Sequence, residues 1–270
     1  MSPFFSFIIL IFGLAVGSLL NAIIYRINSK ESFLLGRSHC PDCLHQLSWK
    51  DLFPVFSFIA LGGKCRYCKK PISCQYPLVE LTTAILFVLI LDYEFRIMNY
   101  EFLSSIFILN SLFQILVCCF LIIIFVYDLK HYIIPDGAVF SAITIAFLYN
   151  FIYSLFIIHN SYFLIQSLIS ATGAAIFFLV IFLVSKGNWM GFGDVKLAFL
   201  MGIFLGYPDI IPALFLAFFI GAIMGVVLII FKKKKFSSEV PFGPFLVAGT
   251  FLALFWGVNL IQWYTNLLTI

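Results

Sequence analysis

Two aspartates lie at the edges of strongly apolar segments and are the residues best placed to do chemistry. Asp128 closes one apolar run, and Asp194 ends the stretch Gly191-Phe192-Gly193-Asp194. An ionisable group at the margin of a membrane segment is costly and tends to mark function. Two carboxylates held close in a low-dielectric setting cannot both ionise easily, so one keeps its proton while the other is a base. An aspartyl protease uses such a pair to activate water and to protonate the peptide carbonyl.

The same two acids admit other interpretations. Asp194 is suited to be an N-cap or first-turn residue, where a carboxylate is favourable, whereas Asp128 at the end of a helix gains nothing from the helix dipole. Helix capping, and a proton or ion path through a transporter, therefore stay open beside the proteolytic pair. Glycines 191 and 193 lack a Cβ atom and would let a substrate backbone approach Asp194.

Four cysteines form a second group with chemical potential. Cys40-Pro41-Asp42-Cys43 and Cys65-Arg66-Tyr67-Cys68 are two Cys-x-x-Cys knuckles separated by twenty-one residues. Each knuckle brings two sulfurs to one side, and two knuckles complete a tetrahedral thiolate site for structural zinc, Zn²⁺. A loop of this size with few large apolar side chains needs such a metal to hold itself together.

The rival interpretations of these cysteines are disulfides, which a reducing cytoplasm disfavours, and redox-active thiols, which need only one knuckle. His39 and His45 could replace a cysteine as ligands, but we expect ordinary loop histidines. The remaining cysteines, expected to be packing residues, are Cys74, Cys118 and Cys119.

The composition defines the solvent of the chain. Hydrophobic residues make up 63% of the 270 positions and charged residues 10%, and the mean hydropathy is +1.11. This exceeds what a soluble domain needs for its core and predicts a polytopic protein in the lipid bilayer. The net charge of +4 indicates no nucleic-acid partner, because the basic residues fall at segment ends. We expect the first apolar segment to be a retained anchor, since it lacks the basic start of a signal peptide.

Apolar runs of about 20 residues predict the membrane spans. The long runs are 3–27, 76–92, 102–127, 137–158, 161–185, 209–231 and 241–264. The run 195–206 is short, and the positive-inside rule decides whether it crosses. If it crosses, all basic residues except Arg96 face the cytoplasm, including Lys130, Lys186 and the run Lys232 to Lys235. The sequence therefore predicts eight spans with both ends outside.

The predicted fold is all-α: a polytopic membrane helical bundle of about eight spans with a small cytoplasmic zinc-binding loop domain. Residues 1–27 form the first span, 28–75 the four-cysteine zinc-type domain, and 76–270 the transmembrane bundle expected to be an aspartyl protease. Asp128 ends a span that runs inward, and Asp194 begins one that runs outward. Both acids are therefore expected at the same cytoplasmic depth, where they can meet.

Short motifs along nearly the whole chain carry a family resemblance. They are Gly17 to Asn21 with Tyr25-Arg26, Arg37 to Cys43, Leu47 to Asp51, Gly63 to Cys68, Tyr76 to Glu80, Asp128 to Asp136, Gly191 to Leu197, and Pro241 to Pro244. In this set and this order the sequence resembles the type IV prepilin peptidases, also called prepilin leader peptidase / N-methyltransferases, a family of GxGD-type membrane aspartyl proteases.

The resemblance implies roles for individual residues. Asp128 and Asp194 would be the two catalytic aspartates, and Cys40, Cys43, Cys65 and Cys68 the cytoplasmic zinc-type motif. The reaction would be cleavage of a short basic leader from type IV prepilins and pseudopilins. The location would be the bacterial inner (cytoplasmic) membrane, with a multi-pass chain whose active site faces the cytoplasm. The pilin concerned would belong to a type IV pilus or type II secretion system.

The resemblance also implies a second activity. Relatives with this cysteine-bearing loop commonly methylate the new N-terminal residue with S-adenosylmethionine, and Glu80 of the Tyr-Pro-x-x-Glu segment is a candidate to bind that methyl donor. A favourable charge at a helix start explains Glu80 equally well. No glycine pattern of a dinucleotide fold appears, so this activity rests on resemblance alone. Gln75 departs from the family pattern, which has an arginine there.

Two further classes of function remain beside the peptidase. An ion-coupled transporter would need a polar path, for which the sequence shows no other interior charges. A zinc-bearing membrane scaffold would tolerate loss of either acid. Near the acids, Lys130 and Lys196 are expected to snorkel to the headgroups, Asp136 to cap the next helix, and His131 to lie at the interface.

Overall fold

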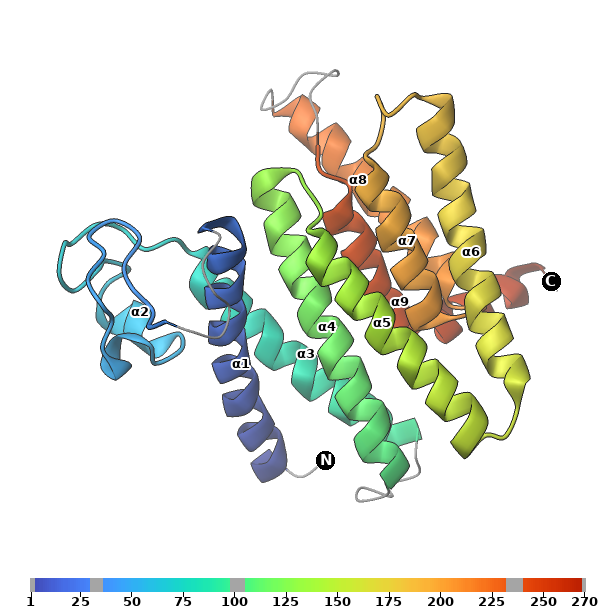
Figure 1. Ribbon diagram of the computed structural model, residues 1–270, viewed down its shortest axis with the longest axis horizontal. Helices are drawn as coiled ribbons and strands as arrows, with labels where there is room; N and C mark the ends of the chain where they lie inside the picture. The colour runs from blue at the N-terminus through green and yellow to red at the C-terminus, as the bar shows by residue number, and fades with distance from the viewer. Residues whose placement is uncertain (1–2, 30–35, 98–104, 232–239, 269–270) are drawn as a thin grey trace. The chain divides into compact units, whose positions relative to one another are not determined.

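The computed structural model describes residues 3–29, 36–97, 105–231 and 240–268, and its regular elements there are all helices, so the predicted all-α class is confirmed (Figure 1). The long helices are α1 (Pro3–Ser29), α3 (Gln75–Ile97), α4 (Ser105–His131), α5 (Asp136–Ile152), α6 (Ser161–Val184), α7 (Phe192–Leu205), α8 (Ile210–Ile230) and α9 (Gly243–Leu268). The short ones are η1 (Trp49–Asp51), α2 (Phe56–Ala60) and η2 (Tyr153–Ile157).

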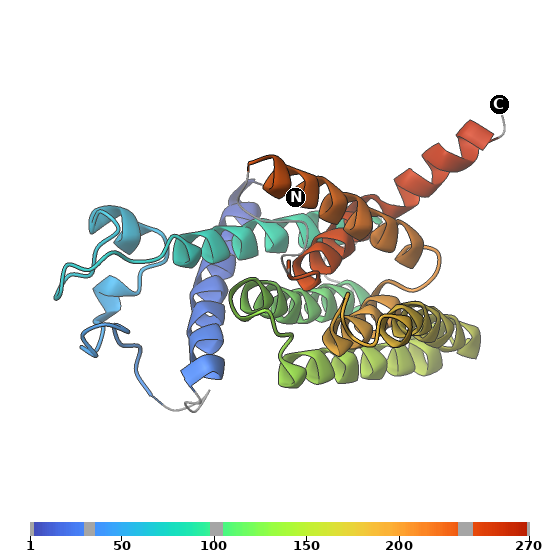
Figure 2. The ribbon, with the colours of Figure 1, turned by 90° about the horizontal axis from the view of Figure 1, so that it is seen from above.

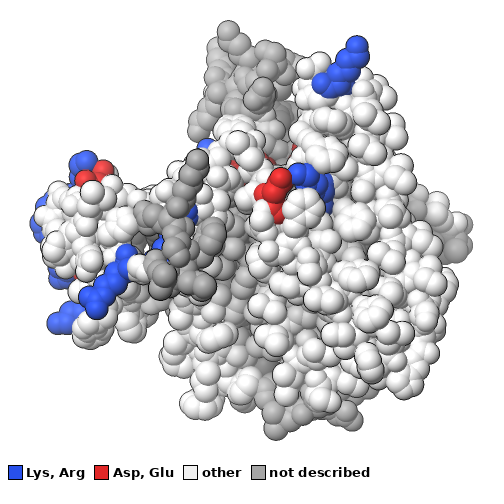
Figure 3. All heavy atoms as spheres, viewed as in Figure 1, with Lys and Arg blue, Asp and Glu red and all other residues white. Residues whose placement is uncertain are grey.

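Six of the described helices are long and apolar enough to cross a membrane, which identifies a multi-pass membrane protein. They are α1, α4, α5 with its continuation η2, α6, α8 and α9. Charged side chains accordingly take up little of the face drawn in Figure 3. Each of the eight expected spans coincides with a long helix, although α3 and α7 are not among the six.

The helix α7 is the doubtful crossing. It has 14 residues, which is about 21 Å of helix against a hydrocarbon core of about 30 Å. The run Lys232 to Lys235, which fixed the predicted topology, lies outside the described residues. The count of eight crossings, like the domain borders at residues 27 and 75, therefore stays a prediction.

The chain divides into two compact units, Met1–Ile123 and Ile124–Ile270. In the first unit α1 packs along α3. A Cβ atom on Gly13 would come within 2.5 Å of the Cα of Ala84, and one on Gly17 within 2.6 Å of the Cα of Glu80. The order of these pairs makes the two helices antiparallel, and glycine lets their backbones touch.

In the second unit α7 is the central helix. It packs against α5, α6, α8 and α9 (Figures 1 and 2). Leu197, Leu200 and Met201 are fully buried, and a Cβ atom on Gly202 would meet the Cα of Ala171 in α6 at 2.5 Å. The short helix α7 is surrounded by other helices, which explains why its sequence is apolar on all its faces. The first turn of α7, which includes Asp194, is positioned by this packing.

Candidate active site

Asp128 lies in the last turn of α4 and is only 4% exposed. The helix extends to His131, further than the expected span, so the acid is part of the helix. The first residue of α9, Gly243, donates its backbone N–H to the Asp128 carboxylate. That N–H is one of the groups that a helix start leaves without an intrahelical partner. A carboxylate is unfavourable at the C-terminus of its own helix, α4, but favourable at the N-terminus of another. The N-terminus of α9 therefore stabilises the Asp128 carboxylate.

Asp194 is the third residue of α7 and is 6% exposed. Its carboxylate accepts a hydrogen bond from the backbone N–H of Gly191, the N-cap residue of α7. This is one half of a capping box, in which the third helical residue reaches back to the N-cap. The expectation of a first-turn position is confirmed, and Asp194 also sits at a helix N-terminus.

The two acids lie close enough for their charges to interact. The side chain of Ile134 lies close both to Gly243, beside Asp128, and to Gly193, beside Asp194. Its Cδ1 lies 3.2 Å from a Cβ atom placed on Gly243 and 3.3 Å from one placed on Gly193. The structure thus gathers the end of α4, the start of α7 and the start of α9 around the two carboxylates.

The glycines beside Asp194 have different roles. A Cβ atom on Gly193 would lie in tight contact with the side chain of Ile134, at 3.0 to 3.4 Å, and the expected access of a substrate beside this glycine stays a prediction. At Gly191 the only heavy atom within 4 Å of such a Cβ, among those compared, is the backbone nitrogen of Gly193 at 3.9 Å. The space beside Gly191 is therefore more open than the space beside Gly193.

Two charged residues beside the pair contact each other. The Nζ of Lys196 lies 2.7 Å from Oδ1 of Asp136 and over the rings of Phe140 and Phe192, and its expected position at the headgroups stays a prediction. Asp136 does not cap α5, because Pro135 is the N-cap residue and no side chain makes the capping bond. An acid in the first helical turn is nevertheless favourable.

Two neighbours from the sequence analysis keep ordinary surroundings. Lys130 is exposed, and the ring of His131 lies 4.5 Å from that of Tyr127. These contacts do not connect Lys130 or His131 to the carboxylates of Asp128 and Asp194.

Among the described residues Glu80 and Glu94 are also buried, and Asp209 has a buried oxygen atom, which corrects the expectation of no other interior charges. Glu94 is 4% exposed and accepts a hydrogen bond from Gln114 at 2.6 Å. Asp209 has a buried Oδ1 without a hydrogen-bond partner, and this atom lies 2.5 Å from a Cβ atom placed on Gly257. No sequence motif predicted that Glu94 would lie beside Gln114 or that Asp209 would lie at the start of α8.

The four predicted cysteine ligands come together. The sulfur atoms of Cys40, Cys43, Cys65 and Cys68 all lie within 4.8 Å of one another, and those of Cys40 and Cys68 are 3.9 Å apart. Sulfurs at about 2.3 Å from a tetrahedral zinc would be roughly 3.8 Å apart, so the four residues fit that metal. The backbone N–H of Cys68 donates to the Cys65 sulfur and, against the effect of burial, lowers the pKa of Cys65 to about 7. A lowered pKa favours the thiolate that a metal binds.

The two knuckles have the same backbone construction. An isolated bridge joins His39 to Gln46 around the first knuckle and Lys64 to Pro71 around the second. In each, the residue after the second cysteine has a positive φ, 57° at Leu44 and 60° at Lys69. His39 and His45 are not part of the four-cysteine group.

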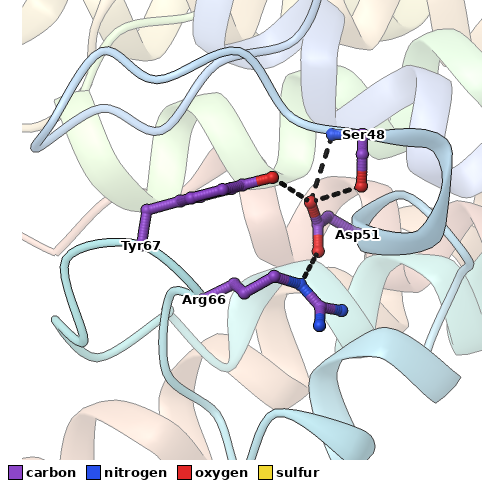
Figure 4. A network of polar contacts seen from close by, with 4 residues as sticks. All are labelled: Ser48, Asp51, Arg66 and Tyr67. Carbon is purple, nitrogen blue, oxygen red and sulfur yellow. Dashed lines mark hydrogen bonds and ion pairs between the residues drawn. The ribbon is translucent and has the colours of Figure 1, made fainter.

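Asp51 joins the segment between the knuckles to the second knuckle (Figure 4). Its Oδ1 accepts a hydrogen bond from Arg66 Nε at 2.6 Å, and its Oδ2 accepts from Ser48 Oγ at 2.8 Å and Tyr67 OH at 3.2 Å. Burial by itself would raise the pKa of Asp51, but these donors outweigh it and lower the pKa to about 2. The Asp51 carboxylate is therefore ionised, and its charge-assisted hydrogen bonds hold two parts of the loop together.

Glu80 is buried and its carboxylate has protein partners. Its Oε2 accepts the backbone N–H of Val55 at 2.8 Å, and the Ser18 side chain also bonds to it. These contacts tie α3 to the loop and to α1, and they do not indicate a place for S-adenosylmethionine. Gln75, where the family pattern has arginine, donates to Asn21 Oδ1 at 3.3 Å. Binding of the methyl donor at Glu80 stays a prediction.

Comparisons with known proteins cover both groups of residues. The Bacterial Peptidase A24 N-terminal domain matches residues 11–93, which include the four cysteines, and the Type IV leader peptidase family matches residues 115–226, which include both aspartates. No solved structure matches this chain.

Several relatives carry the name prepilin leader peptidase/N-methyltransferase. The protein of Legionella pneumophila is 30% identical over 291 residues, which cover 97% of this chain and 95% of that protein. The Bacillus subtilis protein is 32% identical over 260 residues, with 96% and 98% covered. The Pseudomonas aeruginosa protein is 27% identical over 286 residues, with 94% and 91% covered. Identity at this level over nearly the full length of both chains means that this chain belongs to the type IV leader peptidase family.

Proposed function

We propose that this chain is a membrane aspartyl endopeptidase that cleaves the leader peptide from type IV prepilins or pseudopilins at the cytoplasmic face of the inner membrane. The observation that carries the proposal is the meeting of two buried carboxylates, Asp128 and Asp194, each held by a backbone N–H at a helix start. The named activity of the relatives supports the same reaction.

The mechanism follows from the pairing. One carboxylate, ionised, takes a proton from a water molecule, and the resulting nucleophile attacks the scissile carbonyl carbon. The other, protonated, donates its proton to the carbonyl oxygen. The N–H groups of Gly243 and Gly191 hold the two acids in position, so little reorganisation is needed during the reaction. Substrate would approach beside Gly191, where the backbone is least covered.

The test is cleavage of a purified prepilin in detergent by wild type and by two variants, Asp128→Asn and Asp194→Asn. Either change removes proton exchange at one acid while preserving side-chain size, so cleavage should be lost. A matched control is Asp209→Asn, which changes another acid with a buried oxygen atom in the same unit and should cleave normally. Unchanged zinc content and gel-filtration behaviour establish that each variant is folded. Normal cleavage by either Asp128→Asn or Asp194→Asn would refute the proposal.

The alternative function is that of an ion-coupled transporter. The apolar core of the second unit argues against an ion path there. Between Asp194 and Asp209 the interior of α7 consists of fully buried apolar side chains, among them Leu197, Leu200 and Met201. A charge moving along this helix would pass these apolar side chains before it met a buried polar one, Asn150, which donates to the carbonyl of Ile203 at 2.8 Å.

The second proposed activity is N-methylation of the newly exposed N-terminal residue, which the names of the relatives support. S-adenosylmethionine would supply the methyl group, but the contacts of Glu80 do not outline its site, so no step is assigned to a residue. Glu80→Gln separates the two explanations. Loss of methyl transfer with normal zinc retention would favour donor binding, whereas faster zinc loss would favour the structural tie to Val55.

A further inference from the structure

The segment between the two cysteine knuckles exposes several large apolar side chains on and just before the short helix α2. The backbone N–H groups of Ser57 and Ile59 donate to the carbonyls of Phe53 and Val55, which ties the preceding turn to α2. The large apolar side chains on this segment that face outward, with their exposed fractions, are Leu52 (40%), Phe53 (55%), Phe56 (64%) and Ile59 (69%). Phe56 and Ile59 are one helical turn apart in α2, whereas Leu52 and Phe53 precede the turn in which Val55 has a φ of 61°. We call this set the apolar face.

The opposite side of the segment is fixed to the protein. The N–H of Val55 is bound by the Glu80 carboxylate, and the ring of Phe58 lies 3.3 Å from a Cβ atom placed on Gly63. The segment cannot roll over to bury its apolar side without breaking these contacts. The apolar face is therefore held outward by the fold, and four large apolar side chains on one face require a cover.

The bond to Glu80 also sets the height of the segment along the membrane helices. Glu80 is the sixth residue of α3, about 7.5 Å along the axis from Gln75. It lies against Gly17 of α1, a helix long and apolar enough to span the membrane. Outward-facing apolar side chains of α3 lie at the same level, Leu78 at 60% and Leu81 at 42% exposed. The apolar face thus starts beside exposed apolar side chains of α3.

The polar surroundings complement a phospholipid surface. Trp49, 74% exposed, comes just before the apolar face, and the ammonium group of Lys50 lies 5.6 Å from its ring centroid. Both loop aspartates in residues 36–74 are ion-paired, with Arg66 and Lys70. The loop stays basic even when four thiolates and a zinc ion are counted. Tryptophan and lysine beside exposed large apolar side chains are typical of segments in the headgroup layer of anionic membranes.

We propose that the apolar face is a membrane anchor that lies in the headgroup layer of the bilayer and holds the zinc loop against anionic lipid. The anchor is independent of the chemistry assigned to the aspartates. It would keep the loop at a defined height through the tie between Val55 and Glu80.

The test uses the full chain with one tryptophan, in vesicles of phosphatidylethanolamine and phosphatidylglycerol. The native tryptophans at 49, 189, 256 and 263 become phenylalanine, and Phe56→Trp supplies the probe. Ile59→Trp serves if Phe56→Trp loses zinc. Brominated acyl chains should lower the emission of this probe by about half, while acrylamide in the water should hardly reach it. A probe at Leu44→Trp, equally exposed but outside the apolar face, should respond mainly to acrylamide.

Three results would overturn the anchor. The first is a probe at position 56 that acrylamide reaches as readily as the probe at position 44. The second is equal lipid quenching at both positions, which would show contact by the whole loop. The third is shielding of position 56 that needs added prepilin or rises with protein density, which would identify the substrate or a second copy as the cover.

Discussion

Gly243 stands directly against Asp128: a Cβ atom added to it would lie 2.5 Å from the carboxylate Oδ2, and its backbone N–H donates to the same carboxylate. The start of α9 and the end of α4 are thus in contact through one acid and one glycine. Because no other residue type could approach so closely, the position of the acid depends on a glycine far away in the sequence.

Gly243→Ala should therefore impair cleavage without unfolding the chain. The added methyl group must displace the Asp128 carboxylate, and a misplacement of about 1 Å lowers catalysis by about 100-fold. Prepilin cleavage rates at saturating enzyme measure the effect. Gly225→Ala is the control, because a Cβ atom there has no neighbour within 4 Å. Equal rates for the two variants would contradict the assigned contact.

Asp136→Asn should cleave prepilin at close to the wild-type rate. Its carboxylate is 62% exposed and is paired with Lys196, so it is a surface contact of α5 with α7 and takes no part in proton transfer. Exposed ion pairs of this kind contribute little stability. The pH–rate profile of the variant should keep its shape. A loss as large as that of Asp194→Asn would place Asp136 in the reaction and remove the distinction made above.

Two glycine changes should have opposite effects on thermal stability. Gly202→Ala puts a methyl group within 2.5 Å of the Cα of Ala171 and should destabilise the second unit by about 1–3 kcal/mol, as overpacking does. Gly173→Ala, in α6 with open space around it, should stabilise its helix by about 0.5–1 kcal/mol. Thermal unfolding in one detergent measures both. Shifts of the same sign would mean that α6 and α7 do not touch at Gly202.

Asp51→Asn should speed the release of zinc from the loop by about tenfold, measured with a coloured chelator. The amide cannot accept the charge-assisted bond from Arg66, and the tie between Ser48 and the second knuckle weakens. Asp42→Asn is the matched control, since the side chains of Lys70 and Asp42 are 59% and 40% exposed and their ion pair is open to water. Its release rate should equal that of wild type. Identical rates for Asp51→Asn and Asp42→Asn would deny Asp51 any role in the loop.

The effect of Asp51→Asn should not change between about pH 5 and about pH 8. The folded pKa of Asp51 is about 2, below its ordinary value of 3.8, so the stabilisation is complete above the ordinary value and is lost only as the pH falls through the folded one. The ratio of zinc-release rates, variant to wild type, measures this. A ratio that varies with pH in that range would mean that another titrating group controls the loop.

Local patterns predicted the elements well, because the signals are chemical and short in range. The apolar runs gave the positions of the long helices, and the paired knuckles gave the metal-ligand set. Such patterns did not show which atoms meet across the bundle. The pair of Lys196 with Asp136 and the close contact of Ile134 with Gly193 were not visible in the sequence. The Gly243-Pro244 pair at the start of α9 was visible in the sequence, but its contact with Asp128 was not.

By itself, the sequence determined that this is a helical membrane protein of a recognisable family, with two acids next to apolar segments and four cysteines in knuckles. These properties follow from composition and spacing, which any chain carries before it folds. The tertiary structure decided that the start of α9 lies against Asp128, that α7 packs against four other helices, and that the apolar side chains on and before α2 are exposed. Such contacts join residues far apart in the chain, and close packing selects them only when all the helices are in place.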